Sequence, residues 1–370
     1  MRFAPGTTNA NFETVAVPES KQTVLVTGSL GYIGCRLVER LLASGHTVIG
    51  VDIDYYHDAT HGELPLGVSQ LTHIRRDIRE MQQSDFDGVD VVMHLAALSN
   101  DPLGNLDPSL THEINHLASV RLARLARSAG VGRFLFSSSC SSYGASGDSI
   151  LDEEATLNPV TAYGESKVAA ERDILALESS TFSPTILRNA TAYGYSSRWR
   201  QDIVVNDFTA AAWLDRCIKI LSDGTPWRPL VHIDDICSAF IAIAGASQQS
   251  VHAECFNVGS EQANYRVSEL ADLVAAAVPD CDIQYADGGG PDKRCYRVSC
   301  SKLVRHVPAF STKHTVATGV AEMLSAFERN GLEPADVMQG RYARLPAIRR
   351  RQTAGEIDDQ LRRSGGSNGN

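Results

Sequence analysis

Residues 23–34, TVLVTGSLGYIG, set the architecture that we expect for the whole chain. The β-branched run 23–27 is typical of a short buried strand, and the apolar spacing of residues 32–45 is typical of a helix. A tight turn, a close backbone approach to a pyrophosphate and close helix–strand contact each favour glycine. Glycine stands at the three positions concerned, Gly28, Gly31 and Gly34. The stretch therefore predicts a dinucleotide-binding turn, with free N–H groups of the helix start facing the phosphates.

An acidic residue follows the second expected strand. Residues 47–54, TVIGVDID, have the composition of that strand, and Asp52 lies 24 residues beyond the first glycine. A carboxylate there accepts hydrogen bonds from the adenosine ribose hydroxyls and repels a 2′-phosphate. No Arg or Lys occurs in residues 53–63, so NAD is favoured over NADP as cofactor. Asp77 and Ile78, after the third strand, would flank the adenine, or Asp77 only caps the strand end.

Apolar runs and helical patterns alternate through the first half of the chain. Further strands are expected at 73–78, 89–97, 133–139 and 183–194, with a long helix over 108–130. This alternation predicts an α/β protein with a doubly wound parallel sheet of the Rossmann type and a smaller C-terminal α/β substrate domain. Helices in the second part are expected near 203–214, 232–246 and 267–278.

These patterns also suggest divisions of the chain. The N-terminal arm and the arginine-rich C-terminal end have no apolar periodicity, so both are expected to be solvated and at least partly disordered. The expected parts are a flexible arm (1–20), an NAD-binding domain (21–190), a substrate-binding domain (191–340) with segments that return to the first domain, and a tail (341–370).

The composition excludes several classes of partner. The net charge of −10 argues against general nucleic-acid or membrane binding, so an anionic ligand needs local arginines and backbone N–H groups. The eight cysteines form no C-x-x-C pair, the N-terminus has no signal-peptide pattern, and no apolar run approaches the length of a membrane helix. We therefore expect a cytoplasmic protein with reduced thiols. The eleven histidines do not cluster with other ligand types at metal-binding spacing, so no metal is expected.

A phenol and an ammonium share one face of the helix expected over residues 160–178. Tyr163 and Lys167 lie four positions apart in TAYGESK. A neighbouring ammonium and a positive nicotinamide ring would lower the pKa of the tyrosine, which could then take a proton from a substrate hydroxyl while hydride leaves the same carbon. Lys167 would also hold the nicotinamide ribose. Ser139, at the carboxyl end of the strand 133–139, would hydrogen-bond the reacting oxygen.

As a set, these motifs resemble the extended short-chain dehydrogenase/reductases that act on nucleotide sugars, with UDP-galactose 4-epimerase as a well-known member. The resemblance covers roughly residues 22–330 and rests on TGSLGYIG, DID, RDIR, HLAAL, FSSSCSSYG, YGESK and RPLVHIDD. It implies that the catalytic set is Ser139, Tyr163 and Lys167. It also implies an NAD site formed by these last two residues with Gly28, Gly31, Tyr32, Ile33, Gly34, Asp52, Asp77, Ile78, Leu95, Ala96, Ala97 and Asn115. In the family, an asparagine matching Asn115 typically supports the active-site lysine.

The same resemblance implies that the second domain holds a nucleotide-diphosphate sugar. Arg228, in WRPLVHIDD, matches an arginine that grips the diphosphate, and Asn206 matches an asparagine that contacts the diphosphate or base. Arg294 is a candidate for a second contact to the diphosphate. For Arg294, as for Arg198 and Arg200, an ordinary surface ion pair is the open alternative. The family often has Asn at Thr191, and the epimerase has a lysine at Ser99. The implied substrate-binding residues are Ser99, Ser139, Thr191, Asn206, Arg228 and Arg294. A homodimer through helices 108–130 and 160–178 is a further expectation from the family.

Two positions beside the active-site serine separate the possible reactions. Related sugar 4,6-dehydratases carry an Asp–Glu pair where this chain has Cys140 and Ser141, so dehydration ranks low. Cys140 would act as an acid or base at a second carbon, or would only fill space beneath the sheet. The preferred hypothesis is an NAD-dependent epimerase that oxidises the sugar 4-position transiently and regenerates NAD. A 4-ketoreductase with net redox turnover, a 4,6-dehydratase and a non-catalytic dinucleotide sensor remain as alternatives.

Overall fold

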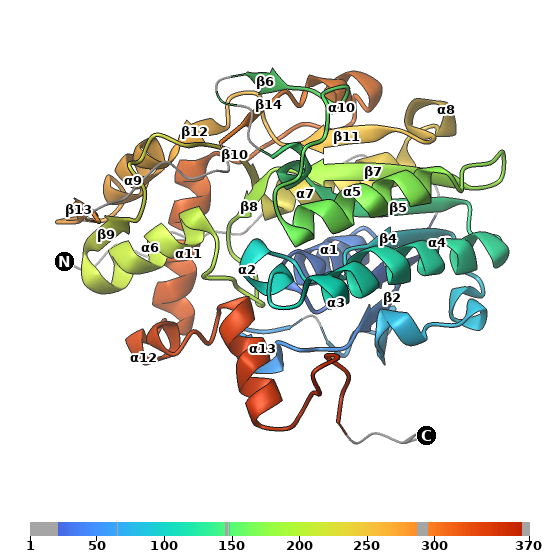
Figure 1. Cartoon of the computed structure of the whole chain (residues 1–370), viewed down its shortest axis with the longest axis horizontal. Coiled ribbons are helices and arrows are strands. Elements are labelled where there is room, and N and C mark those ends of the chain that lie inside the picture. The colour runs from blue at the N-terminus through green and yellow to red at the C-terminus, as the bar shows by residue number, and fades with distance from the viewer. Residues whose placement is uncertain (1–20, 65, 145–146, 148, 287–294, 365–370) are drawn as a thin grey trace.

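A seven-stranded parallel sheet organises the molecule (Figure 1). The computed structural model describes residues 21–364, apart from 65, 145–146, 148 and 287–294. The strand order is β11–β7–β5–β4–β1–β2–β3, so the order reverses between β1 and β4, where such sheets bind their ligands. The strands are β1 (Thr23–Thr27), β2 (Thr47–Asp52), β3 (Leu71–Arg75), β4 (Val91–His94), β5 (Arg133–Ser139), β7 (Ser183–Asn189) and β11 (Cys255–Val258).

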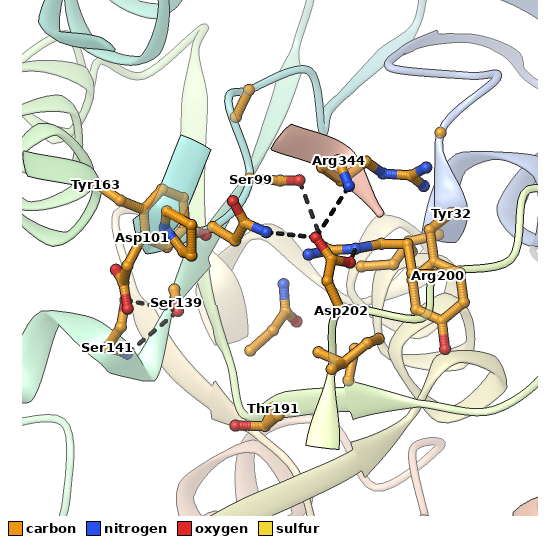
Figure 2. Close-up of a pocket in the computed structure, with 18 of the residues that line it drawn as sticks. Tyr32, Ser99, Asp101, Ser139, Ser141, Tyr163, Thr191, Arg200, Asp202 and Arg344 are labelled. Atoms are coloured by element: carbon orange, nitrogen blue, oxygen red, sulfur yellow. Dashed lines mark hydrogen bonds and ion pairs between the residues drawn. The ribbon is translucent and has the colours of Figure 1, made fainter. Parts of the chain in front are cut away.

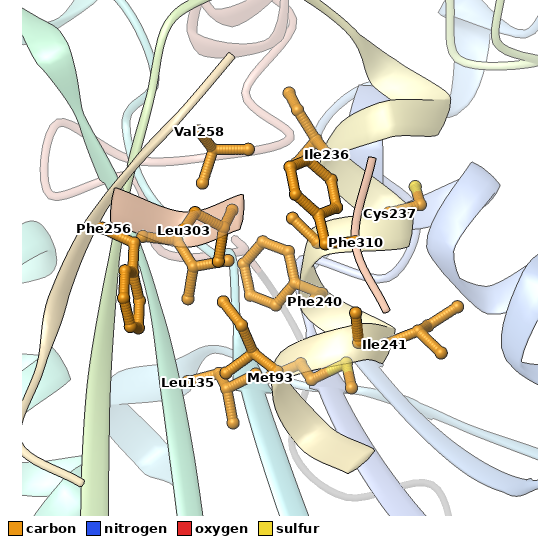
Figure 3. Close-up of a cluster of buried hydrophobic side chains, with 14 of the residues drawn as sticks. Met93, Leu135, Ile236, Cys237, Phe240, Ile241, Phe256, Val258, Leu303 and Phe310 are labelled. Atoms are coloured by element: carbon orange, nitrogen blue, oxygen red, sulfur yellow. The ribbon is translucent and has the colours of Figure 1, made fainter. Parts of the chain in front are cut away.

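The two faces of the sheet bury two separate hydrophobic clusters, because successive strand residues point to opposite sides. Val24 and Val26 of β1 join the cluster beneath α1 (Tyr32–Ala43) and α7 (Ile233–Gly245). Leu25, between them, joins the cluster beneath α4 (Ala118–Ser128) and α5 (Ala162–Leu175). Figure 3 shows the first cluster, in which Phe240 of α7 lies close to Leu135 of β5. Each fully buried side chain of this kind contributes about 1.5–3 kcal/mol.

The second region lies beside the carboxyl ends of the large sheet (Figure 1). Its helices α6 (Val204–Asp215), α9 (Val267–Ala275) and α11 (Val316–Asn330) enclose a third cluster with Trp199 fully buried. Its strands are β8 (Thr191–Tyr193), β10 (Trp227–His232) and β12 (Asn264–Arg266) in one sheet, with the pairs β9 (Cys217–Ile220)–β13 (Asp282–Tyr285) and β6 (Ile150–Leu151)–β14 (Arg297–Val298). Later in the chain, α7 and β11 lie on the large sheet, where β11 pairs with β7.

Shorter elements complete the description. The expected helix over 108–130 is continuous but consists of α3 (Pro108–His112), a π-helical turn η4 (Glu113–Leu117) and α4. The remaining helices are η1 (His57–Ala59), η2 (Ile78–Glu80), η3 (Gln83–Phe86), α2 (Asp101–Gly104), η5 (Cys140–Tyr143), α8 (Gln248–Val251), α10 (Ser301–His306), α12 (Pro334–Met338) and α13 (Arg344–Thr353).

The C-terminal segment differs from the expected solvated tail. Ile348 of α13, with Ile357 and Leu361 beyond it, joins the hydrophobic cluster on the α4 side of the large sheet. Arg351 is buried and forms ion pairs with Asp58 at 2.5 Å and Glu356 at 2.5 Å. The expectation failed because two of the four buried residues of α13 are arginines, Arg344 and Arg351, and hydrophobic periodicity does not detect them.

Two bulk features complete the fold. All eight cysteines are free, and four of them are buried. Within the described part of the chain, no helix combines the length and the apolar character needed to cross a membrane.

Candidate active site

A cavity of about 780 Å³ opens at the carboxyl ends of β1, β2, β4, β5 and β7 and reaches into the second region. Most residues that the sequence assigned to the site line it, namely Gly28, Gly31, Tyr32, Ile33, Gly34, Asp52, Asp77, Ile78, Leu95, Ala96, Ala97, Ser99, Ser139, Tyr163, Lys167, Thr191 and Arg228. Asn115 and Asn206 are outside its wall, and Arg294 lies outside the described residues.

The glycine turn between β1 and α1 forms one end of the cavity. Gly28 has a φ of 72°, in the left-handed region, and a Cβ added there would lie 2.8 Å from the backbone nitrogen of Ala96. A Cβ at Gly34 would lie 1.9 Å from the carbonyl oxygen of Gly28, so both positions require glycine. Gly31 caps α1 without a side-chain hydrogen bond. The first N–H groups of α1 therefore remain available to an anion in the cavity, as a dinucleotide pyrophosphate requires.

The acidic residues beside the turn have different functions. Asp52 accepts hydrogen bonds from the backbone N–H groups of Leu30 at 2.9 Å and Asp54 at 2.7 Å, which fixes its carboxylate at the end of β2. Burial raises the pKa of Asp52. Asp77 instead pairs with Arg79 at 2.6 Å and caps η2. Asp52 is therefore well placed for ribose hydroxyls, and the turn and this acid together fit the adenosine diphosphate part of NAD.

The catalytic candidates converge at the other end of the cavity (Figure 2). Ser139 ends β5, and its Oγ accepts hydrogen bonds from the backbone N–H of Ser141 at 3.1 Å and from the hydroxyl of Ser141 at 2.9 Å. Tyr163 lies in the first turn of α5 and lines the same wall as Ser139, which lowers its pKa. Because Ser139 already accepts two hydrogen bonds, its own proton is available to the phenol or to a substrate oxygen. Lys167 donates to the carbonyl of Ser137 at 2.7 Å.

In the cofactor-free protein, burial is the largest influence on the pKa of both Tyr163 and Lys167. Burial raises the pKa of Tyr163 to about 12, although the hydrogen bond with Ser139 lowers it. Burial lowers the pKa of Lys167 to about 7, and Glu171 opposes that shift. We expected Lys167 and the nicotinamide ring to lower the pKa of Tyr163. In the cofactor-free protein this pKa is raised instead, because burial disfavours both the phenolate and the ammonium.

Two asparagines from the sequence prediction position loops instead of lining the cavity. Asn115, in the π-helical turn, accepts a hydrogen bond from the backbone N–H of Leu98 at 2.8 Å and donates one to the hydroxyl of Ser166 at 3.2 Å. It therefore fixes the segment after β4 beside the cofactor end. Asn206 is fully buried and donates to the hydroxyl of Tyr32 and the carbonyl of Arg200. A substrate-binding role for Asn206 is not supported by this geometry, because its amide is already hydrogen-bonded within the protein.

Several residues that the sequence missed or left open meet at Asp202 (Figure 2). Its carboxylate accepts hydrogen bonds from Asn100 at 2.5 Å, from Arg200 at 2.9 Å and from the backbone N–H of Arg344 at 3.1 Å. Arg200 also reaches Ser99 Oγ at 3.4 Å, so it brings a cation to the position where the epimerase has lysine. Arg200 and Asp202 are two positions apart in the sequence. No sequence pattern indicated that Asp202 contacts Asn100 and Arg344, which lie more than a hundred positions away.

Cys140 lies outside the cavity that holds the catalytic candidates. Its side chain is fully buried, it does not line the cavity, and its thiol lies 3.1 Å from the carbonyl of Arg188. Burial raises the pKa of the thiol, which therefore stays neutral. Ser141 lines the cavity in its place and has no titratable group.

The fold brings together a cluster of two histidines and an aspartate that the sequence did not indicate. Ligand atoms of His232, Asp234 and His314 lie within 4.8 Å of one another. Asp234 already pairs with Arg36 at 2.8 Å, and His232 with Glu322 at 2.8 Å. These existing partners explain the cluster as a link between α1, α7 and α11.

A tyrosine–serine pair that faces a dinucleotide turn across one parallel sheet defines an extended short-chain dehydrogenase/reductase, an enzyme that moves hydride between a nicotinamide and a carbinol carbon. Residues 24–259 match the family model described as the NAD dependent epimerase/dehydratase family, and the chain belongs to this family. NAD is thus the cofactor, as the sequence predicted.

Similar proteins carry several related activities. The chain is 30% identical to a UDP-glucose 4-epimerase of Mycolicibacterium smegmatis over 329 residues, which cover 82% of this chain and 97% of the relative. It is 28% identical to MoeE5, solved with UDP-glucuronic acid and NAD, with a TM-score of 0.72 over 83% of this chain and 99% of that one. DesIV of Streptomyces venezuelae, a dTDP-glucose 4,6-dehydratase, shares the fold at 22% identity and a TM-score of 0.71, over 83% of this chain and 97% of that one. The fold alone therefore does not distinguish epimerases from dehydratases.

Proposed function

We propose that the protein is an NAD-dependent nucleotide-sugar epimerase that oxidises the sugar 4-position transiently. The observation that carries the proposal is that Ser139 and Tyr163 line the same cavity as the glycine turn, where Ser139 is close enough to lower the pKa of Tyr163. Elimination of water needs an acid and a base beside this pair. Cys140 is buried and neutral and Ser141 is a hydroxyl, so neither supplies one. The similarity to a UDP-glucose 4-epimerase over most of the chain also supports the proposal.

The chain's own residues would move one proton in each direction. NAD, held by the glycine turn and Asp52, would supply a hydride acceptor for the sugar carbon and, once reduced, a hydride donor to the opposite face. Tyr163 takes the proton of the sugar hydroxyl and later gives it back, and Ser139 donates a hydrogen bond to the same oxygen. Lys167 lies one helical turn beyond Tyr163. Its protonated form would stabilise the phenolate of Tyr163, and its side chain would orient the nicotinamide ribose.

The sugar must turn over while its nucleotide stays bound. We propose that Arg228 grips the diphosphate and that Thr191 and Ser99 contact the sugar end, since all three line the cavity. Guanidinium suits this task because its fork of N–H donors matches phosphate oxygens. The proposed division remains an NAD-binding part (21–190) and a substrate-binding part (191–340), with α7 and β11 on the first.

The test is isomer formation without added cofactor. Purified protein is incubated with UDP-, GDP-, dTDP- and CDP-sugars, and the products are resolved by chromatography and NMR. We expect one nucleotide class to yield a 4-epimer while the absorbance of NADH stays constant. Stoichiometric consumption of NADH would instead identify a ketoreductase, and a 4-keto-6-deoxy product would identify a dehydratase.

We further propose a cytoplasmic homodimer formed through the helices α3–α5. Leu117, in η4, is 52% exposed although it is large and apolar, which is consistent with an interface on this face. Light scattering should give the mass of two chains for the wild type, and Leu117→Glu should give one. A wild-type mass of a single chain at micromolar concentration would contradict the dimer.

A further inference from the structure

A buried guanidinium at the glycine-turn end of the cavity has no counter-ion among the residues that the structure describes. Arg344, the first residue of α13, is 2% exposed and lines the cavity. Its Nη2 donates to the carbonyl of Arg198 at 3.2 Å, and its guanidinium lies over the ring of Tyr56 at 4.1 Å. Its Nη1 is buried without a hydrogen-bond partner, and no described carboxylate forms an ion pair with it.

The neighbouring carboxylates already have cationic partners. Arg198 pairs with Asp54 at 2.9 Å, and Arg200 pairs with Asp202 at 2.9 Å. Arg344 is therefore a surplus positive charge, and burial, followed by repulsion from Arg200, lowers its pKa to about 10. Because an uncompensated buried charge is costly, this arrangement calls for an anionic ligand.

The location of Arg344 indicates which diphosphate it would contact, that of NAD or that of the nucleotide sugar. Tyr56, beneath its guanidinium, belongs to the loop after β2, and Arg198, whose carbonyl it contacts, pairs with Asp54 of that loop. Asp52, at the end of β2, accepts a hydrogen bond from the backbone N–H of Leu30 in the glycine turn before α1, whose N–H groups have no side-chain cap. The guanidinium and the helix N-terminus therefore act on the same end of the cavity.

The substrate end of the cavity has its own cation. Arg228 of β10 lines the wall there, in the second region. In Figure 2, Arg344 and Tyr32 lie on one side of Asp202, and Tyr163 and Ser139 lie on the other. We propose that Arg344 binds the diphosphate of NAD, so that the C-terminal helix retains the cofactor through turnover. The inference rests on the proposed function only for the presence of NAD in this cavity. Arg344 lies beyond residues 24–259, which the family model covers.

The test compares ligands that do and do not carry a diphosphate. Arg344→Met keeps an apolar stem over Tyr56 and removes the charge, Arg344→Lys restores a charge, and Arg350→Met is the matched control. Arg350 belongs to the same helix, but its guanidinium contacts the carbonyl of Gln339 and does not line the cavity. Affinities of the cofactor-free proteins for NAD, adenosine and UDP are measured by calorimetry at low and high KCl concentration, and NAD release by stopped flow.

We expect Arg344→Met to weaken NAD binding about 10- to 100-fold and to speed its release, as for a lost charge-assisted hydrogen bond. The affinities of Arg344→Met for adenosine and UDP should stay within about twofold of those of the wild type. Arg344→Lys should recover part of the lost NAD affinity. High KCl concentration should reduce the difference in NAD affinity between the wild type and Arg344→Met. Equal weakening of adenosine would assign Arg344 a merely structural role, and weakening of UDP alone would assign it to the substrate diphosphate. Either result overturns the proposal. If the wild type binds NAD but forms no isomer, the proposed function fails while this inference is still tested.

Discussion

Tyr163 has to lose a proton from a position where burial opposes its charge. The pKa of about 12 in the chain alone means that the neutral phenol is the resting form near pH 7. The hydrogen bond with Ser139 is the main influence from the chain that lowers the pKa. The remaining stabilisation of the phenolate must come from the positive nicotinamide ring and from Lys167 when it is protonated.

At this residue scale, we expect Tyr163→Phe to reduce kcat about 10³-fold, within the range of a lost general acid–base group. NAD content should be unchanged, because the phenol contributes little to the glycine-turn end of the cavity. Product formation and bound nucleotide are both quantified, with Tyr285→Phe as the control, since Tyr285 is exposed and distant on β13. Full activity of Tyr163→Phe would contradict the proposed chemistry.

Lys167 gives a prediction for pH dependence. Burial lowers its pKa from 10.5 to about 7 in the cofactor-free protein. Between these values the unfolded chain binds a proton that the native chain lacks, so this group makes the free energy of unfolding rise with pH. The slope for one proton is about 1.4 kcal/mol per pH unit.

The test uses urea unfolding of the cofactor-free wild type and Lys167→Met between pH 7 and 9. We expect the difference between the two free energies of unfolding to change in favour of the wild type as pH rises. The comparison cancels other titrating groups, which both proteins share. A difference that is independent of pH would show that the native lysine keeps its proton.

Residue types with a fixed local pattern were predictable from the sequence. Gly28, Asp52 and Tyr163 follow spacing rules set by the turn, the strand end and the helix, and the structure brings all three to one cavity. Arg200 and Arg344 follow no such rule, because their places depend on Asp202 and on the docking of α13. Sequence proximity gives no information on contacts between segments so far apart.

At the scale of elements, a buried ion pair connects α5 to β7. Glu171, on the helix of Tyr163, pairs with Arg188 at 2.8 Å, and both side chains are at most 7% exposed. Ser138 of β5 donates to the same carboxylate. This network fixes α5 against the strands that carry the active-site serine, so its integrity determines how Tyr163 approaches Ser139.

We expect Glu171→Gln to lower the free energy of unfolding by about 3–5 kcal/mol, because it leaves the guanidinium of Arg188 buried without a counter-ion. The double variant Glu171→Leu/Arg188→Met should lose less, since no charge remains. Urea unfolding of the wild type, the single variant and the double variant measures both effects. A double variant that is less stable than Glu171→Gln would show that the network contributes more than charge compensation.

Elements with a clear hydrophobic period were also predictable, whereas those held by polar contacts were not. The six expected strands of the large sheet and the helices α6, α7 and α9 lie within about five residues of their expected bounds, whereas no strand was expected at β11. In contrast, the run 349–351 was expected to be solvated, but successive helical residues point about 100° apart. Arg349 is exposed, Arg350 half-buried and Arg351 buried, so one arginine of the three anchors the helix.

At the scale of the whole molecule, the C-terminal segment connects the outer edge of the large sheet to the cavity. α13 begins at the cavity with Arg344, and its other end contacts the loop after β2 through Arg351. Arg351 also donates to the carbonyl of Tyr55, which lines the cavity. Opening of this segment would therefore expose the cofactor end of the site.

We expect Arg351→Met to increase cleavage of the C-terminal segment by subtilisin about 10- to 100-fold, because α13 loses the contacts of its buried guanidinium with Asp58, Glu356 and the carbonyl of Tyr55, which oppose its local opening. Arg349→Met, on the exposed face of the same helix, is the control and should be cleaved like the wild type. Mass spectrometry locates the cut, which should fall within residues 340–364, and NAD added in excess should slow it, since a ligand held by Arg344 stabilises the closed segment. Cleavage of Arg351→Met at the wild-type rate would show that the apolar contacts of Ile348, Ile357 and Leu361 hold the segment by themselves.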